Sequence, residues 1–149
     1  MKNTRLCTFW EYLFLFLFGG TAYCLLELHW RHWTHWSMFL AGGLVFCIIG
    51  VENQKIRWEW PLVSQALLAG LTITAIEFLF GCIFNLGLHM HVWDYSKQPF
   101  NLLGQICLKW SLLWCGIGLV GVIVDDFLRW RIFGEEKPHY RLQIGRAHV

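Results

Sequence analysis

The sequence predicts an all-α integral membrane protein, a bundle of four transmembrane helices with both termini in the cytoplasm. Hydrophobic residues make up 56% of the chain and charged residues only 15%, whereas a typical soluble domain is about 25% charged. Four long apolar segments are also visible, and a helix needs about 20 mostly apolar residues to cross the hydrocarbon core. No alternation typical of strands competes with this interpretation.

The four segments run from about residue 8 to 28, 33 to 51, 61 to 90 and 100 to 124. Lys2 and Arg5 precede the first segment, as in a signal peptide. However, no A-x-A cleavage site follows, and the apolar run is longer than a signal peptide requires. We therefore expect the first segment to be retained as a spanning helix.

Basic residues near the segment ends predict the orientation, because cytoplasmic loops carry an excess of Lys and Arg. One side receives only Arg31 and Lys97. The other receives Lys2, Arg5, Lys55, Arg57, Arg129, Arg131, Lys137 and Arg141. This side is expected to be cytoplasmic, in a plasma membrane of the bacterial inner-membrane type. Near the predicted ends lie the tryptophans of an interfacial aromatic belt, namely Trp10, Trp30, Trp33, Trp36, Trp58, Trp60, Trp93 and Trp130.

Small residues recur at helical spacing and predict faces where neighbouring helices approach closely. The rows are Gly43 with Cys47, Ala66 with Gly70, Gly70 with Thr74, and Ser111 with Cys115 and Gly118. A compact bundle explains them without any further role.

Motifs that indicate chemistry in soluble proteins lack their context here. Residues 116–121 match GxGxxG but fall inside a spanning segment with no preceding strand, so a dinucleotide site is not expected. The six cysteines form no CxxC pair, and we expect them to be small buried hydrophobes. No Walker A, HExxH or GxSxG signature is present. The chain is therefore expected to be neither an enzyme nor a cofactor protein, and its net charge of +2 does not favour nucleic acid.

Glu77 and Lys109 are the first candidate site, because each lies deep inside a predicted span. At about 1.5 Å per residue, both are expected some 13–17 Å below the outer helix ends. An ionised residue near the bilayer centre costs about 2.5–3.5 kcal/mol on insertion scales. We therefore expect either an ion pair or a carboxyl group held neutral, serving as a polar site on a transport path or as a buried structural pair.

The loop between the third and fourth segments is the second candidate. Its candidate residues are Trp93, Asp94, Tyr95, Asn101 and Gly104, and the loop also contains Pro99. Asp and Asn side chains bond to nearby backbone and favour turns. Asn101 could also cap the fourth helix. We expect an interfacial or re-entrant loop of fixed shape, either a binding element or a well-capped connection.

Histidines and acidic residues at the segment ends are weaker candidates. Imidazole is a common Zn or Cu ligand, and one side is expected to carry His29, His32, His35, His89 and His91. No Cys or carboxylate completes a metal spacing, so interfacial histidines are the preferred interpretation. Solvated helix ends are expected to hold Glu11, Glu27, Asp125 and Asp126.

The last residues have a separate origin in our interpretation. Residues 144–149 resemble the translation of a sequencing-library adapter. We therefore expect one domain, residues 1–143, with a native sequence that runs to about Gln143.

The stretch from Glu77 to Cys115 resembles the small bacterial membrane proteins catalogued as ABC-transporter type IV (CmpB-like) permeases. The resemblance is carried by Glu-Phe-Leu-Phe-Gly at 77–81, Val-Trp-Asp-Tyr-Ser at 92–96 and Phe-Asn-Leu-Leu-Gly-Gln-Ile-Cys-Leu at 100–108. Two positions depart from the expected pattern: Asn85 stands where an acidic residue is expected, and Gln105 where arginine is expected.

The resemblance implies a multi-pass transporter component whose ATP hydrolysis would come from a separate ATPase subunit. Our first hypothesis is a permease-like subunit with an unknown substrate, whose polar site comprises Glu77, Lys109 and the Asp94 loop. Two alternatives stay open: a structural or regulatory protein that docks a partner through the Trp93-Asp94-Tyr95 hairpin, and an extracytoplasmic metal-binding protein. Because four helices are few for a complete pathway, we expect a homo- or hetero-oligomer.

Overall fold

The computed structural model describes residues 4–140, with side chains from residue 8 onward. Helix α1 spans Thr4–Arg31, α2 Trp36–Lys55, α3 Leu62–Phe80 and α4 Leu108–Arg131. Helix α3 continues into a π-helical segment, η1 (Gly81–Gly87), and strands β1 (Asn101–Leu102) and β2 (Ile106–Cys107) form a small antiparallel hairpin before α4. The expected adapter-derived tail at 144–149 lies outside the described residues.

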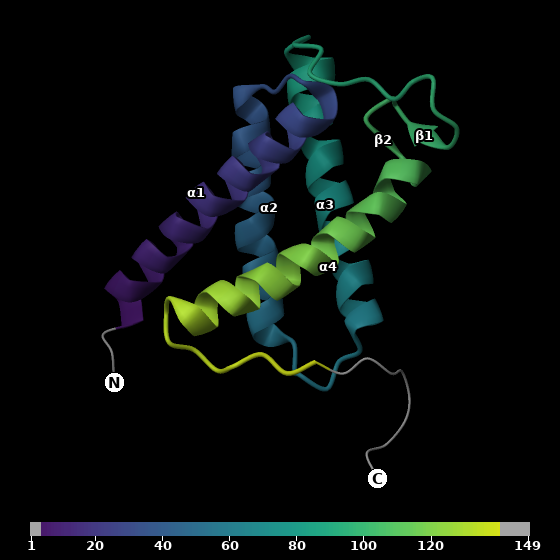
Figure 1. Ribbon diagram of the computed structural model, residues 1–149. Coiled ribbons are helices and arrows are strands. Elements are labelled where there is room, and N and C mark those ends of the chain that lie inside the picture. The colour runs from purple at the N-terminus through teal and green to yellow at the C-terminus, as the bar shows by residue number, and fades with distance from the viewer. Residues whose placement is uncertain (1–3, 141–149) are drawn as a thin grey trace.

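Four helices in the described part of the chain are long and apolar enough to cross a membrane, which confirms the predicted all-α membrane bundle. They run alternately up and down, so both described chain ends lie at the same end of the bundle (Figure 1). We call this the inner end, because the Lys and Arg distribution predicts that it faces the cytoplasm. The opposite end, with the α1–α2 connection and the loop of residues 88–107, is the outer end.

The fourth helix begins later than the sequence predicted, at Leu108 instead of about residue 100. Phe100 and Leu103 have φ of 54° and Gly104 has φ of 72°, and this left-handed backbone cannot join a right-handed helix. Asn101 therefore does not cap α4; the residue at that position is Cys107, without a side-chain cap. Lys109 consequently lies in the first turn of α4 at the outer end, not near the bilayer centre.

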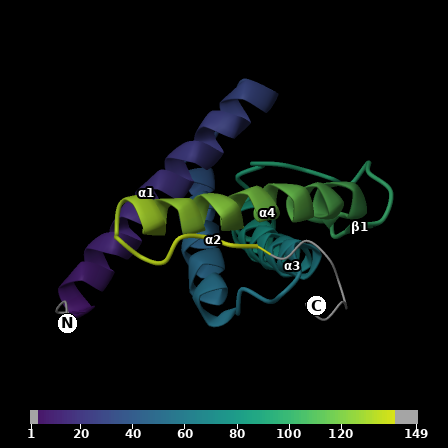
Figure 2. The same cartoon turned by 60° about the horizontal axis from the view of Figure 1, so that its bottom comes forward.

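Small residues let the helices pack as two close pairs, α1 with α2 and α3 with α4 (Figures 1 and 2). A Cβ atom added to Gly118 of α4 would lie 2.6 Å from the Cβ atom of Ala69 in α3, and one added to Gly70 would clash with Cys115. The predicted small-residue faces are thus confirmed at Gly70, Cys115 and Gly118. In the other pair, a Cβ atom on Gly19 would clash with Phe46.

Three groups of buried apolar side chains follow one another along the bundle. The outer group contains Met38, Ala41, Phe80, Val92 and Trp93; the middle group Ile49, Ala69, Ile73, Trp114 and Val122; and the inner group Leu15, Phe46 and Leu128. Large apolar side chains elsewhere on the helices face outward, as expected where lipid is the solvent. The middle group separates two polar regions.

Two glycines of α4 provide a test of the α3–α4 contact. Gly118→Ala should destabilise the protein by about 1–3 kcal/mol because the new methyl group overpacks the interface with Ala69. Gly116, in the same helix, has no atom within 4 Å of the position of an added Cβ. Gly116→Ala should therefore be neutral or stabilise by up to about 1 kcal/mol through helix propensity. Denaturant unfolding in the same detergent gives the change in stability of each variant. Equal changes in the two variants would contradict the close contact between Gly118 and Ala69.

Candidate functional site

Glu77 is the centre of a polar site in the outer half of the bundle, between α3, α4 and the loop. Its Oε1 atom accepts a hydrogen bond from the Tyr95 hydroxyl at 2.7 Å, and its Oε2 atom accepts one from the Trp114 indole N–H at 2.9 Å. Both donors are neutral. The carboxyl group is thus held by the loop on one side and by α4 on the other.

Of the two arrangements expected for Glu77, the ion pair with Lys109 is wrong. Lys109 is exposed in the first turn of α4. Among the described residues, no Lys, Arg or His forms an ion pair with Glu77. The physical reason is the late start of α4, which places Trp114 instead of Lys109 at the level of Glu77.

Aromatic rings surround the Glu77 site. The Tyr95 and Trp110 rings stack with centroids 6.3 Å apart, Trp110 contacts Trp114 at 5.9 Å, and Tyr23 of α1 contacts Trp114 at 6.1 Å. Burial, followed by the nearby Glu77 carboxylate, raises the pKa of Tyr95 well above its ordinary value. The Tyr95 hydroxyl therefore stays protonated and remains a donor to Glu77.

A second polar group anchors the loop to η1. The Asn85 amide donates to Gln105 Oε1 at 2.8 Å, and Asn85 Oδ1 accepts the Val92 backbone N–H. The Trp93 indole donates to the Gln105 carbonyl at 2.9 Å. Positions 85 and 105, where the resemblance led us to expect an acid and an arginine, are therefore bonded to each other as a pair of amides.

The inward position of Trp93 weakens one alternative. The sequence predicted an interfacial Trp93, but its side chain is 8% exposed and belongs to the outer apolar group. The Tyr95 hydroxyl likewise points to Glu77. Partner docking through the Trp93-Asp94-Tyr95 hairpin would need these two rings on the surface.

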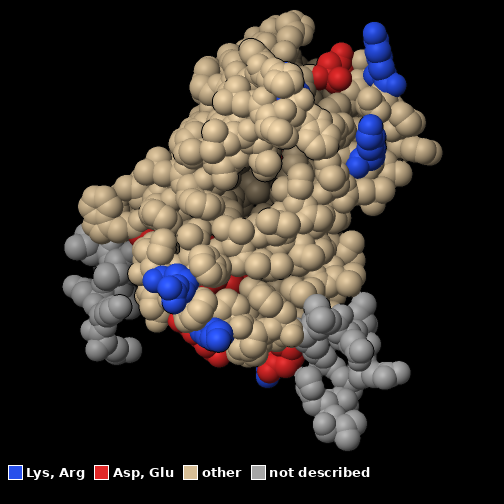
Figure 3. Space-filling view, in the orientation of Figure 1, with Lys and Arg blue, Asp and Glu red and all other residues tan. Residues whose placement is uncertain are grey.

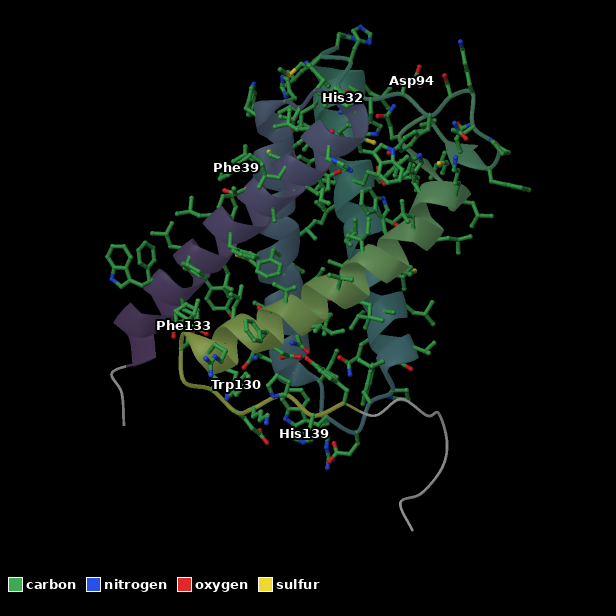
Figure 4. All side chains as sticks on the ribbon, viewed as in Figure 1. His32, Phe39, Asp94, Trp130, Phe133 and His139 are labelled. Carbon is green, nitrogen blue, oxygen red and sulfur yellow. The ribbon has the colours of Figure 1, made fainter. Side chains whose placement is uncertain are left out.

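The remaining predicted loop residues hold the shape of the loop. Asp94 Oδ1 accepts the Ser96 backbone N–H at 2.8 Å, which keeps the pKa of the exposed Asp94 carboxyl below its ordinary value, and Figure 4 places Asp94 at the outer edge of the loop. Asn101 donates to the carbonyls of Ser96 and Gln98 and accepts the Gly104 N–H. These residues form turns and do not reach Glu77.

At the inner end, the structure reveals a buried charged network that the sequence analysis missed. Asp125 and Asp126 were expected to be solvated, but Asp125 is 0% and Arg129 3% exposed. The Arg129 guanidinium bonds to both Asp125 oxygens at 3.1 Å and to Glu11 Oε1 of α1 at 2.9 Å. The Asn53 amide of α2 donates to Asp125 and Asp126. Arg129 thereby joins α4 to α1, and Asn53 joins α2 to the aspartates of α4.

Residues 134–140, here called the strap, cross the inner end below α2 (Figures 1 and 2). The Tyr140 hydroxyl donates to Asp126 Oδ2 at 2.7 Å, which together with burial raises the pKa of Tyr140. Trp58 donates to Glu136 and contacts the His139 ring at 4.6 Å, and Figure 4 shows His139 at this end. The strap is thus fastened to both α4 and the α2–α3 connection.

A polar pocket of about 180 Å³ lies beside the strap. Its lining comprises Asn53, Gln54, Ile56, Arg57, Trp58, Gln65, Asp126, Arg129, Glu135 and Glu136. A smaller cavity of about 10 Å³ shares Asn53, Ile56 and Gln65 with it and extends to Ile49, Ala69 and Val122 of the middle apolar group. The smaller cavity thus lies next to the polar pocket and against the middle apolar group.

The histidines do not come together. His35 caps α2 by accepting the Ser37 N–H at 3.2 Å, whereas His29, His32, His89 and His91 are exposed. Within the part of the chain that the structure describes, no three His, Cys, Asp or Glu side chains have an arrangement suited to a metal ion. The metal-binding alternative gains no support.

Comparison with known proteins adds one finding. The family model described as "Putative ABC-transporter type IV" matches residues 9–134 of the chain. Neither the curated proteins nor the solved structures include a match.

Arg129 and Arg131 give a matched test of the inner network. Arg129→Met should destabilise the protein by about 3–5 kcal/mol, since it leaves the carboxylates of Glu11 and Asp125 buried without a cation. Arg131 is exposed and contacts only the Trp130 ring among the described residues. Arg131→Met should cost about 1 kcal/mol or less. The unfolding free energies of the two variants, measured with denaturant under identical conditions, test this prediction. Similar losses of stability in both variants would show that the Arg129 network does not stabilise the fold.

A double-mutant cycle tests the Asn85–Gln105 pair. Asn85→Asp and Gln105→Arg should each destabilise the protein, because each buries a charge without an opposite partner. The two together should recover part of the loss through an ion pair, with a coupling energy of at least about 1 kcal/mol. Unfolding free energies of the four proteins give the coupling, and strictly additive losses would contradict the pairing.

Proposed function

Because this chain belongs to the family described as "Putative ABC-transporter type IV", we propose that it is a permease-like membrane subunit of a transporter, with Glu77 in the solute path. The family match and the four apolar helices indicate a membrane transporter component. The observation that carries the finer proposal is a buried carboxyl group without a cationic partner among the described residues. Intramembrane ionisable residues mark substrate or ion paths more often than other positions.

A second polar atom continues the proposed path below Glu77. Thr74 lies one helical turn closer to the inner end on α3, and its hydroxyl oxygen is buried without a hydrogen-bond partner within the described residues. Buried polar atoms are nearly always satisfied. We therefore assign the Thr74 hydroxyl to the proposed path as a second polar position beside the Glu77 carboxyl group.

The inner pocket supplies the other end of this path. Gln65 lines the pocket and precedes Glu77 by about 18 Å along α3, at about 1.5 Å per residue. Between them lies the middle apolar group, whose member Trp114 contacts Glu77 directly. We assign this group the role of a closed barrier, with a polar pocket on its inner side and the Glu77 carboxyl on its outer side.

The assembly is part of the same proposal. Because four helices are few for a complete pathway, the chain is proposed to work as a homo- or hetero-oligomer in the plasma membrane. The described residues carry none of the nucleotide-binding motifs of an ATPase. Any ATP hydrolysis would therefore come from a separate subunit.

Thiol accessibility at position 77 tests the solute path. We would label Glu77→Cys, with the native cysteines replaced, using a membrane-impermeant thiol reagent from each side. Leu79→Cys is the matched control, because Leu79 lies two residues away on the same helix and is 51% exposed on the surface expected to face lipid. We expect labelling at 77 from at least one side and none at 79.

The opposite result is equally informative. If neither position labels in the folded protein, water does not reach Glu77. The Glu77–Tyr95–Trp114 cluster would then be a structural contact, and the transport proposal would fail.

A further inference from the structure

The hairpin of residues 99–108 exposes several apolar side chains. All of its residues except Leu108, the first residue of α4, lie outside the spanning helices. Phe100 is 82% exposed, the highest value among the large hydrophobic residues described, and Leu103 is 63% exposed. Leu102 and Leu108 are also exposed. In water, exposure of this much apolar surface at one site is unfavourable. The hairpin therefore needs an apolar neighbour.

The backbone holds these side chains outward at a cost in strain. Phe100 and Leu103 both have φ of 54°, a left-handed conformation that is uncommon for residues with a Cβ atom. Asn101, with its three hydrogen bonds to the loop, and the Leu108 N–H bond to the Phe100 carbonyl at 3.3 Å keep this geometry. Such strain persists only where the surrounding structure imposes it, and it gathers at functional positions.

The hairpin lies beside the bundle and not above it. Figure 1 shows β1 and β2 next to the first turn of α4, lower in the view than the upper end of α3. The exposed apolar surface continues from Leu108 onto Leu112 of α4, in a helix long and apolar enough to span a membrane. The hairpin tip and the lipid-facing side of α4 thus form one continuous apolar surface.

Cationic side chains flank this surface. Lys97 and Lys109 are both exposed, on either side of the hairpin in sequence, and basic and acidic side chains gather at the same upper edge in Figure 3. Lysine near a membrane surface extends its ammonium group to lipid phosphates while its methylene chain covers apolar surface. The apolar tip suits the acyl chains of the lipid interface, and the flanking lysines suit its phosphates.

We propose that the hairpin tip, residues 100–103, inserts into the outer lipid interface, with Lys97 and Lys109 on headgroup phosphates. The occupant is phospholipid. The Tyr95 N–H bonds to the Gly104 carbonyl at 2.7 Å, so the inserted tip also holds Tyr95 in position against Glu77. The proposal does not depend on whether the protein transports a solute.

The first test uses the unaltered protein in vesicles of equal parts phosphatidylcholine and phosphatidylglycerol. A lipid with a photoreactive diazirine in its acyl chain is activated, and tryptic peptides are analysed by mass spectrometry. Cleavage after Lys97 and Lys109 yields residues 98–109 as one peptide. We expect adducts within residues 100–103, as well as on the α4 peptide, and none on residues 132–141, which include the strap. Adducts confined to Leu108 would overturn the proposal.

The second test locates the tip directly. Phe100→Cys and Leu103→Cys carry an environment-sensitive fluorophore in the cysteine-replaced protein, and Ser96→Cys is the matched control on the polar part of the same loop. We expect brominated lipid to quench the fluorophore at 100 and 103, and aqueous iodide to quench it about tenfold less efficiently there than at 96. Equal iodide quenching at all three positions would place the tip in water and point instead to a soluble protein partner.

The lysines have their own readout. Lys97→Gln and Lys109→Gln should each lower the preference of the tip for phosphatidylglycerol over phosphatidylcholine by up to about fivefold, measured as the ratio of adduct yields in the two lipids. An unchanged ratio in the double variant would overturn the contact between the lysines and the headgroups. Insertion of the tip is decided by the photolabelling and quenching tests.

Discussion

The need to satisfy every polar group inside lipid from within the protein governs this structure. Several polar side chains in the spans reach a partner on another element, whereas the Thr74 hydroxyl has none among the described residues. Glu77 meets Tyr95 and Trp114, and Asn85 meets Gln105. Glu52 of α2 likewise accepts the Thr72 hydroxyl of α3 at 2.8 Å. Because apolar packing against lipid-like neighbours discriminates little between helix rotations, these contacts fix which face of each helix points inward.

The polar contacts divide the bundle into layers. The inner layer is charged and is centred on Arg129. The outer layer contains the Glu77 carboxyl group among aromatic rings, and an apolar group lies between the two layers. Such a division suits a protein that must keep two compartments separate, since the low dielectric of the middle layer opposes the passage of ions. It also places the two polar layers on opposite ends of α4, so a tilt of this one helix would change both together.

The sequence was sufficient for the fold because its strongest signal, apolar segments of spanning length, is local. The small-residue faces at Gly70 and Gly118 were predictable for the same reason. The start of α4 was not, because the apolar composition of residues 100–107 resembles that of a helix while the left-handed backbone at Phe100 and Leu103 depends on loop hydrogen bonds. That error of about two turns displaced Lys109 and produced the wrong partner for Glu77.

The inner network was only partly accessible to sequence reasoning. Asp125 and Arg129 are four residues apart, a spacing at which opposite charges pair on a helix, and this signal could have been used. Glu11 of α1, however, bonds to Arg129, which lies 118 residues later in the chain. Asn53 of α2 bonds to Asp125, which lies 72 residues later. No local pattern predicts such meetings. The Asn85–Gln105 pair was missed for the same reason. In the sequence, each amide only stands in place of an expected charged residue, and nothing local indicates that the two are bonded to each other.

The order in which these contacts arise has a consequence for biosynthesis. Glu77 leaves the ribosome 37 residues before Trp114, so α3 must meet the translocation machinery with its carboxyl group unsatisfied. An unpaired acidic residue near the middle of a span costs about 2.5–3.5 kcal/mol on insertion scales. Helix α3 is therefore expected to wait at the protein-conducting channel until α4 is made, and the two helices enter the bilayer as one hairpin.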